Sequence, residues 1–283
     1  MNNKFDWNRF CKVVNKDFRN MWPMFGTTMI ILAVLPFAVW LFMTVIGVDV
    51  PLDPAFRLIM IQGVAYIAAM MAPSRMYRTW NLRDEGIYYA MLPATKLEKY
   101  LSALLFSLVV CPLGVYLGSF VLDMFLTALP FGAWEDWLWE SKVGFPFILD
   151  LGTILSEMAA SDYGAEAFRV MYFGTLYNIS CWLGYIGTVL MFVFTATLFK
   201  RHKVLQTILW LYVINFVLSI VLIPVFMFLF GSTDFMEWMY ELPERMSTEQ
   251  MVGWFFGISI AFDVLLIVLF GWLSWRRLKK MPY

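Results

Sequence analysis

Few side chains in this sequence could carry out chemistry, and those few are scattered. The chain has 283 residues and one histidine, His202, which excludes a His-rich metal cluster, a bis-His haem site and an HExxH protease motif. Cys11, Cys111 and Cys181 are isolated, which favours buried apolar roles over a disulfide framework. No glycine-rich nucleotide-binding motif is present. We therefore expect no catalytic residue, no metal and no cofactor in this chain.

Asp263 stands out because it lies near the middle of a long apolar run. A carboxyl group at the centre of a membrane helix costs about 2.5–3.5 kcal/mol on insertion scales, so it should face a cavity or a polar partner. Two interpretations stay open: Asp263 lines a translocation pathway, or neighbouring hydroxyl groups hold it in a structural role. Gln62, Asn178 and Asn215 are candidate partners, and with Asp263 they form the candidate translocation pathway.

The apolar runs around these residues define the class of protein. The composition is 61% hydrophobic and 15% charged, whereas soluble domains have about 45–50% apolar and about 25% charged residues. Runs of about 20 apolar residues predict membrane-spanning helices. The six predicted spans are 25–48, 56–72, 101–125, 170–199, 206–230 and 252–275. This all-α, polytopic pattern excludes a soluble enzyme and a nucleic-acid-binding protein.

Basic residues predict the orientation of these spans. Seventeen of the 21 Lys and Arg residues lie before the first span, in loop 73–100, in the connection 200–205 and after the last span. Because basic segments stay in the cytoplasm, we expect both termini there and the long loop 126–169 outside. In this arrangement Arg57 begins the second span and can snorkel to the interface, and Pro73 should end that span.

The first 24 residues predict an amphipathic helix that lies flat on the inner membrane surface. Apolar side chains recur every three or four residues on one face: Trp7, Phe10, Cys11, Val14, Phe18 and Met21. Basic side chains share the same spacing on the opposite face: Arg9, Lys12, Lys16 and Arg19. Basic helices with aromatic faces bind lipid headgroups, so membrane lipids are an expected partner. We divide the chain into this helix, 1–24, and one six-helix membrane domain, 25–283.

Two pairs of glycines have the spacing of close helix packing. Gly114 and Gly118 lie in the third span, and Gly253 and Gly257 lie in the sixth. Small residues at this spacing let two helix backbones approach closely. They predict packing within the chain or at a dimer seam.

The loop 73–100 has the most informative local sequence. Thr95 and Glu98 have capping-box spacing, so a helix should start there and continue into the third span. The loop also contains many apolar side chains: Trp80, Leu82, Ile87, Tyr88, Tyr89, Met91 and Leu92. Apolar content of this kind indicates contact with a membrane surface or a partner protein.

The loop contains Asp84-Glu85-Gly86, then Met91-Leu92-Pro93-Ala94-Thr95, and Glu98 ahead of an apolar helix. This order resembles the signature of the membrane (permease) subunits of type-2 ATP-binding-cassette exporters, as do the six spans, the internal termini and the amphipathic N-terminal helix. The resemblance implies that the loop contains a coupling helix. Its implied docking residues are Arg78, Trp80, Arg83, Asp84 and Glu85.

The resemblance also implies the partners of the chain. A separate ATPase subunit would bind ATP and Mg²⁺, and the permease would work as a homodimer or heterodimer in a bacterial inner membrane. The substrate is not identified by the sequence, although the apolar spans favour an amphiphile. One departure is that the family has its larger outer segment between spans five and six, whereas here loop 126–169 is the long one.

Two other functions stay open. A non-transporting scaffold or regulatory anchor would use the same basic surface to hold a cytoplasmic partner. An intramembrane hydrolase would need a histidine within the membrane, whereas His202 lies between Arg201 and Lys203 at the expected inner surface.

Overall fold

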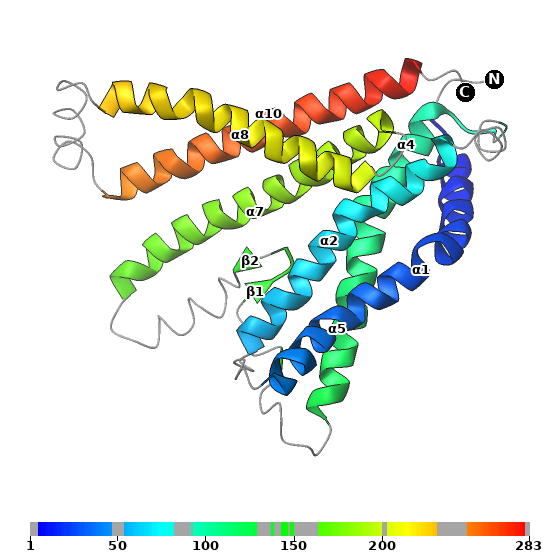
Figure 1. Ribbon diagram of the computed structural model, residues 1–283, viewed down its shortest axis with the longest axis horizontal. Coiled ribbons are helices and arrows are strands. Elements are labelled where there is room, and N and C mark those ends of the chain that lie inside the picture. The colour runs from blue at the N-terminus through cyan, green and yellow to red at the C-terminus, as the bar shows by residue number, and fades with distance from the viewer. Residues whose placement is uncertain are drawn as a thin grey trace.

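The computed structural model describes residues 5–46, 54–81, 91, 93–128, 137–138, 143–146, 148–149, 164–199, 203–230 and 248–280. Long helices dominate these residues (Figure 1). The helices are α1 Trp7–Val45, α2 Pro54–Asn81, α4 Lys96–Leu105, η1 Phe106–Val110, α5 Cys111–Thr127, α7 Gly164–Leu198, α8 Lys203–Phe230 and α10 Thr248–Lys280. Two short strands, β1 Val143–Gly144 and β2 Ile148–Leu149, pair antiparallel between α5 and α7 in the chain.

The fold is that of a helical, multi-pass membrane protein. Among the described residues, five helical stretches are long and apolar enough to cross a membrane. They are Phe25–Phe42, Phe56–Tyr77, Lys96–Thr127, Met171–Leu198 and Gln250–Lys280. The remaining expected span, 206–230, falls within α8, in which the described apolar stretch covers Lys203–Val213.

Helix α1 joins the expected interfacial helix to the first span without a break. It passes through Pro23 and Pro36, and its first turns stand at an angle to the rest of the helix (Figure 1). Proline removes a backbone hydrogen bond and bends a helix. The N-terminal turns can therefore run across the end of the bundle while the rest of α1 follows its long axis.

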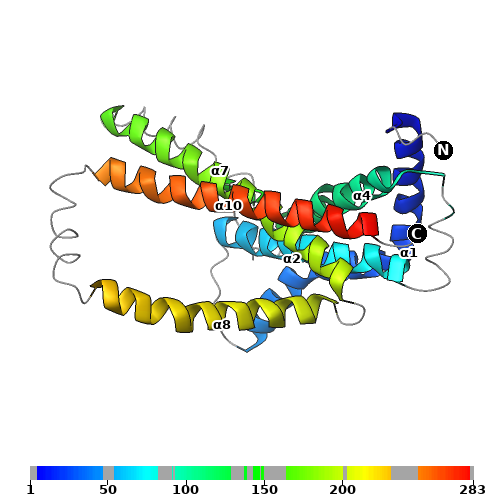
Figure 2. The ribbon, with the colours of Figure 1, turned by 90° about the horizontal axis from the view of Figure 1, so that it is seen from above.

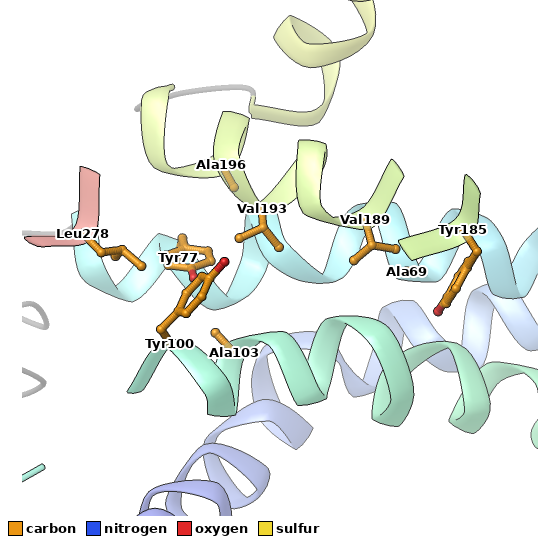
Figure 3. Packing of buried hydrophobic residues seen from close by; sticks show 9 residues of the cluster. All are labelled: Ala69, Tyr77, Tyr100, Ala103, Tyr185, Val189, Val193, Ala196 and Leu278. Atoms are coloured by element: carbon orange, nitrogen blue, oxygen red, sulfur yellow. The ribbon is translucent and has the colours of Figure 1, made fainter. Parts of the chain in front are cut away.

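Helix α2 lies at the centre of the bundle because one of its faces is made of alanine. Ala65, Ala68, Ala69 and Ala72 are fully buried, so neighbouring helices can approach the α2 backbone closely. It packs against α1, α5 and α7. Figure 3 shows the largest buried cluster, which joins four helices. Its members are Ala69, Tyr77, Tyr100, Ala103, Tyr185, Val189, Val193, Ala196 and Leu278.

The C-terminal helices lie on opposite flanks. Helix α10 packs along α7, whereas α8 lies on the other side of the bundle and contacts α7 and α2 (Figure 2). Large apolar side chains remain exposed on both α8 and α10, including Leu209, Phe216, Phe262 and Leu265. Exposed apolar surface of this extent fits helices that face lipid.

A π-helical turn, η1, interrupts the third span at Phe106–Val110. Pro112 lacks an N–H group, so the carbonyl of Leu108, four residues earlier, loses its usual helical partner. The Tyr185 hydroxyl of α7 donates to that carbonyl at 2.7 Å. Single π turns of this kind are often found at functional sites.

Candidate functional site

We expected α2 to end at Pro73, but the helix continues to Asn81. Packing outweighs the helix-breaking effect of proline here, because the later residue Tyr77 is 1% exposed in the core. Arg78 and Trp80 therefore belong to the last turn of α2, of which the structure describes only the backbone. Arg83, Asp84 and Glu85 lie outside the described residues.

The capping box predicted at the start of α4 is confirmed. The Thr95 hydroxyl accepts a hydrogen bond from the Glu98 N–H at 3.3 Å, and Glu98 Oε2 accepts one from the Thr95 N–H at 2.8 Å. The cap fixes the point at which the 73–100 loop becomes the third span. Thr95 is half-buried and Glu98 fully buried.

Glu98 also holds the N-terminal turns of α1, which the sequence did not predict. Its Oε1 atom lies 3.1 Å from Arg9 Nη2 and accepts a hydrogen bond from the Asp6 N–H at 2.9 Å. One helical turn after Glu98, the Ser102 hydroxyl donates to Oδ2 of Asp17, which lies about two turns after Arg9 in α1, at 2.6 Å. We call Asp6, Arg9, Asp17, Glu98 and Ser102, together with the cap residue Thr95, the Glu98 junction. It joins α1, the end of the loop and the third span.

The junction divides the N-terminal part of α1 into three faces. Val13 and Asp17 are buried against the bundle, and Arg9 turns to Glu98 rather than to the exposed basic face. The aromatic face is exposed, with Trp7 at 66% and Trp22 at 68%. An exposed aromatic face beside an exposed basic face is typical of a helix in the plane of a membrane surface.

A buried ion pair closes the opposite end of α2 and α5. Arg57 Nη1 lies 3.1 Å from Asp123 Oδ2 and 3.2 Å from Oδ1, and it also reaches the Thr127 hydroxyl at 3.4 Å. Arg57 is 7% and Asp123 0% exposed. Arg57 therefore turns inward to Asp123 instead of reaching the interface, and its guanidinium group pairs directly with the buried carboxylate.

Asp263 lies on the side of α10 that faces α7. Its Oδ2 atom is 3.5 Å from the Ser180 hydroxyl, which lies 3.3 Å from the Ser259 hydroxyl. Gly184 of α7 lies beside the carboxyl group, since a Cβ there would be in ordinary van der Waals contact with Oδ2 at 3.9 Å. Tyr66 of α2 packs against the ring of Tyr185, the residue after Gly184, with the ring centroids 5.4 Å apart. We call Ser180, Ser259 and Asp263 the central polar cluster.

The candidate partners of Asp263 are distributed over three helices. Gln62 is fully buried in α2, and Asn178 is half-buried in α7. Asn215 belongs to α8, and its side chain lies outside the described residues. Sequence reasoning missed Ser180 and Ser259, because serine is common in membrane helices and gives no signal without the helix pairing. Of the described residues, no group of three or more His, Cys, Asp and Glu could hold a metal ion.

The glycine pairs differ in their surroundings. A Cβ at Gly114 would lie 2.5 Å from Met29 Cε, and one at Gly118 would lie 3.5 Å from Ala33 Cβ, so α5 approaches α1 closely here. A Cβ at Gly253 would lie 3.6 Å from the Tyr172 hydroxyl of α7. Around Gly257 the described residues leave open space.

Comparison of the chain with protein-family models, with characterised proteins and with solved structures finds no match.

Proposed function

We propose that this chain is the membrane-spanning subunit of an ATP-driven exporter of the type-2 ATP-binding-cassette class. In this proposal α8 also crosses the membrane, as the fifth of six spans, and both termini are cytoplasmic. Two permease subunits, identical or different, bind separate ATPase subunits that hold ATP and Mg²⁺. The substrate is an amphiphile, and the membrane is a bacterial inner membrane.

The observation that carries the proposal is the Glu98 junction. An exporter must convert movement of its ATPase into movement of its spans, so the docking loop needs a rigid connection to them. Glu98 binds the last loop residue, Thr95, and the N-terminal turns of α1, and it lies in the first turn of the third span. Displacement of the loop would therefore move α1 and α4 together. A scaffold that only anchors a partner has no need for such a connection.

The test is co-purification in mild detergent with a Walker-motif ATPase encoded beside this chain. We expect Trp80→Ala and Arg83→Glu to release the ATPase, because buried aromatic and Arg side chains usually dominate such interfaces. Membrane insertion should be unchanged, since most basic residues of the loop remain. Trp254→Ala is the matched control, because Trp254 is an exposed tryptophan near the far end of α10.

The outcomes distinguish the two functions. Release of the ATPase by both loop variants, with retention in Trp254→Ala, supports the exporter. If the ATPase is retained and its coupled hydrolysis unchanged in both loop variants, Trp80 only rests among headgroups, and the scaffold becomes the better proposal.

A further inference from the structure

The loop between α5 and α7 contains a hairpin that enters the helical bundle. Strands β1 and β2 pair through Val143 with Leu149 and Gly144 with Ile148. The hairpin lies between α7 and the α2–α5 side of the bundle (Figure 1), and β2 contacts α7. Its turn carries Phe145, which packs against the largest buried cluster.

The depth of Phe145 follows from its ring contacts. The ring centroid lies 5.6 Å from that of Tyr116 in α5 and 5.5 Å from that of Tyr185 in α7. Tyr116 precedes the end of α5 at Thr127 by three helical turns, or roughly 16 Å. Half of the hydrocarbon core of a bilayer is about 15 Å. Phe145 therefore lies far below the end of α5, at a distance comparable to half of the hydrocarbon core.

Non-helical backbone at this depth must be covered by protein or line water, because lipid cannot satisfy its polar groups. The hairpin meets this requirement by lying between helices. Its Pro146 is buried, and Phe145 is half-buried. It is thus a re-entrant segment, although its sequence is too short and too irregular to be recognised as a span.

Phe145 completes a cluster of aromatic rings contributed by three helices. Around Tyr185, the Tyr66 ring of α2 lies at 5.4 Å and the Trp182 ring at 6.4 Å. The hydrogen bond from the Tyr185 hydroxyl to the Leu108 carbonyl holds this ring in place. The central polar cluster lies beside these rings: Gly184 precedes Tyr185, and a Cβ on Gly184 would lie 3.9 Å from Asp263 Oδ2. The helices thus provide an apolar site with a carboxyl group nearby, and a loop residue fills it.

We propose that the paired strands β1 and β2 and the turn residue Phe145 form a re-entrant plug, and that the Phe145 ring occupies a binding site for the apolar part of a cationic amphiphile. The helices supply Tyr66, Tyr116 and Tyr185 as the apolar wall, and Asp263 supplies the opposite charge. Because Phe145 comes from a loop, it leaves this site without breaking a helix. The binding site rests on the proposed export function, because an exporter must bind its substrate. The plug rests only on the ring contacts described above.

The native Cys181 reports whether the plug is closed. It lies one turn before Tyr185 on the same face of α7. In a chain with Cys11→Ser and Cys111→Ala, reconstituted into vesicles, we expect a membrane-impermeant cationic thiol reagent to label Cys181 slowly from the hairpin side. Phe145→Ala should raise the labelling rate at least tenfold. Phe145→Leu keeps apolar volume at this position and should give an intermediate rate. This graded response would distinguish loss of the plug from a folding defect in Phe145→Ala.

The control and the probe separate the two parts of the proposal. Phe173→Ala removes a half-buried ring that contacts Tyr172, about three helical turns before Tyr185 in α7, and should not change the labelling rate. Tetraphenylphosphonium, which combines aromatic rings with a positive charge, should slow labelling in Phe145→Ala, and adding Asp263→Asn should weaken this protection.

Fast labelling of Cys181 with Phe145 intact, or an unchanged rate in Phe145→Ala, would overturn the plug. Absence of protection by tetraphenylphosphonium would overturn the binding site. Neither result depends on an ATPase, so the export function is tested separately by co-purification.

Discussion

At the scale of single residues, buried charges hold together helix segments that are distant in the chain. Arg57 pairs with Asp123 between α2 and α5, and Arg9 pairs with Glu98 between α1 and α4. Each carboxylate is fully buried. A buried pair adds little net stability compared with apolar residues, but removal of one partner leaves an uncompensated charge. These pairs therefore fix which helices are neighbours.

We expect Arg57→Ala to destabilise the protein by about 3–5 kcal/mol, because the Asp123 carboxyl group would stay buried without its charge and hydrogen-bond partner. The measurement is the thermal unfolding midpoint in detergent, followed by tryptophan fluorescence. The double variant Arg57→Met with Asp123→Leu should lose less than the single variant. Lys12→Ala, which removes an exposed basic residue, serves as the control. If Arg57→Ala lowers the unfolding midpoint no more than Lys12→Ala does, the ion pair does not stabilise the fold.

Sequence patterns predicted local contacts but not long-range ones. The capping box at Thr95 and Glu98 was predictable because both partners lie within one turn. The bonds of Glu98 to Arg9, and of Asp17 to Ser102, were not, because helical periodicity defines a face and not the helix that covers it. For the same reason Asp263 was recognised by its depth, whereas its neighbours Ser180 and Ser259 were not.

At the scale of helices and loops, tertiary packing overrides local signals in several places. Pro73 does not end α2, and Pro23 does not end α1. Pro112 does not end the third span either: the helix continues through a π turn, and the Leu108 carbonyl accepts a hydrogen bond from Tyr185. The re-entrant hairpin gave no signal in the sequence, because short strands between polar segments resemble an ordinary outer loop.

Lys203, the first residue of α8, should make the stability of the fold depend on pH. It is buried, and its Nζ atom has no hydrogen-bond partner in the described part of the chain. Burial disfavours the ammonium form and lowers the pKa of Lys203 to about 8. In the unfolded chain the pKa is about 10.4. The unfolded state thus binds more protons, and stability should increase as the pH rises from about 8 to about 10.4.

We expect Lys203→Met to stabilise the protein at pH 7, by an amount on the order of 1–3 kcal/mol, since it removes the cost of burying the charge. The gain should shrink toward pH 10, where wild-type Lys203 is largely neutral in the fold. Unfolding midpoints in detergent at pH 7, 8.5 and 10 measure this difference. Lys12→Met is the matched control on an exposed site. A gain that does not vary with pH would assign the effect to packing instead of charge.

At the scale of the whole molecule, one central helix organises the bundle. The alanine face of α2 brings α1, α5 and α7 together, α10 follows α7, and α8 lies on the opposite flank (Figure 2). Apolar length and composition predicted the membrane class because a bilayer demands long apolar helices. The order of packing was not predictable, because every span is apolar on most faces and its neighbours are chosen by small residues and buried polar pairs.

The orientation of the whole molecule decides which side of the membrane each end of the bundle faces. It determines whether the Glu98 junction lies on the cytoplasmic side, where an ATPase could bind. The basic residues of the N-terminal turns of α1 and of the last turn of α10 predict that these ends are cytoplasmic. We expect Asp162→Cys, ahead of α7, to react with an impermeant thiol reagent in intact cells when Cys11, Cys111 and Cys181 are replaced. Glu85→Cys should react only after the cells are permeabilised. The reverse pattern would place the 73–100 loop outside, where no ATPase could reach it, and would remove the basis of the export proposal. The contacts of the hairpin between α5 and α7 do not depend on the orientation and would be unaffected.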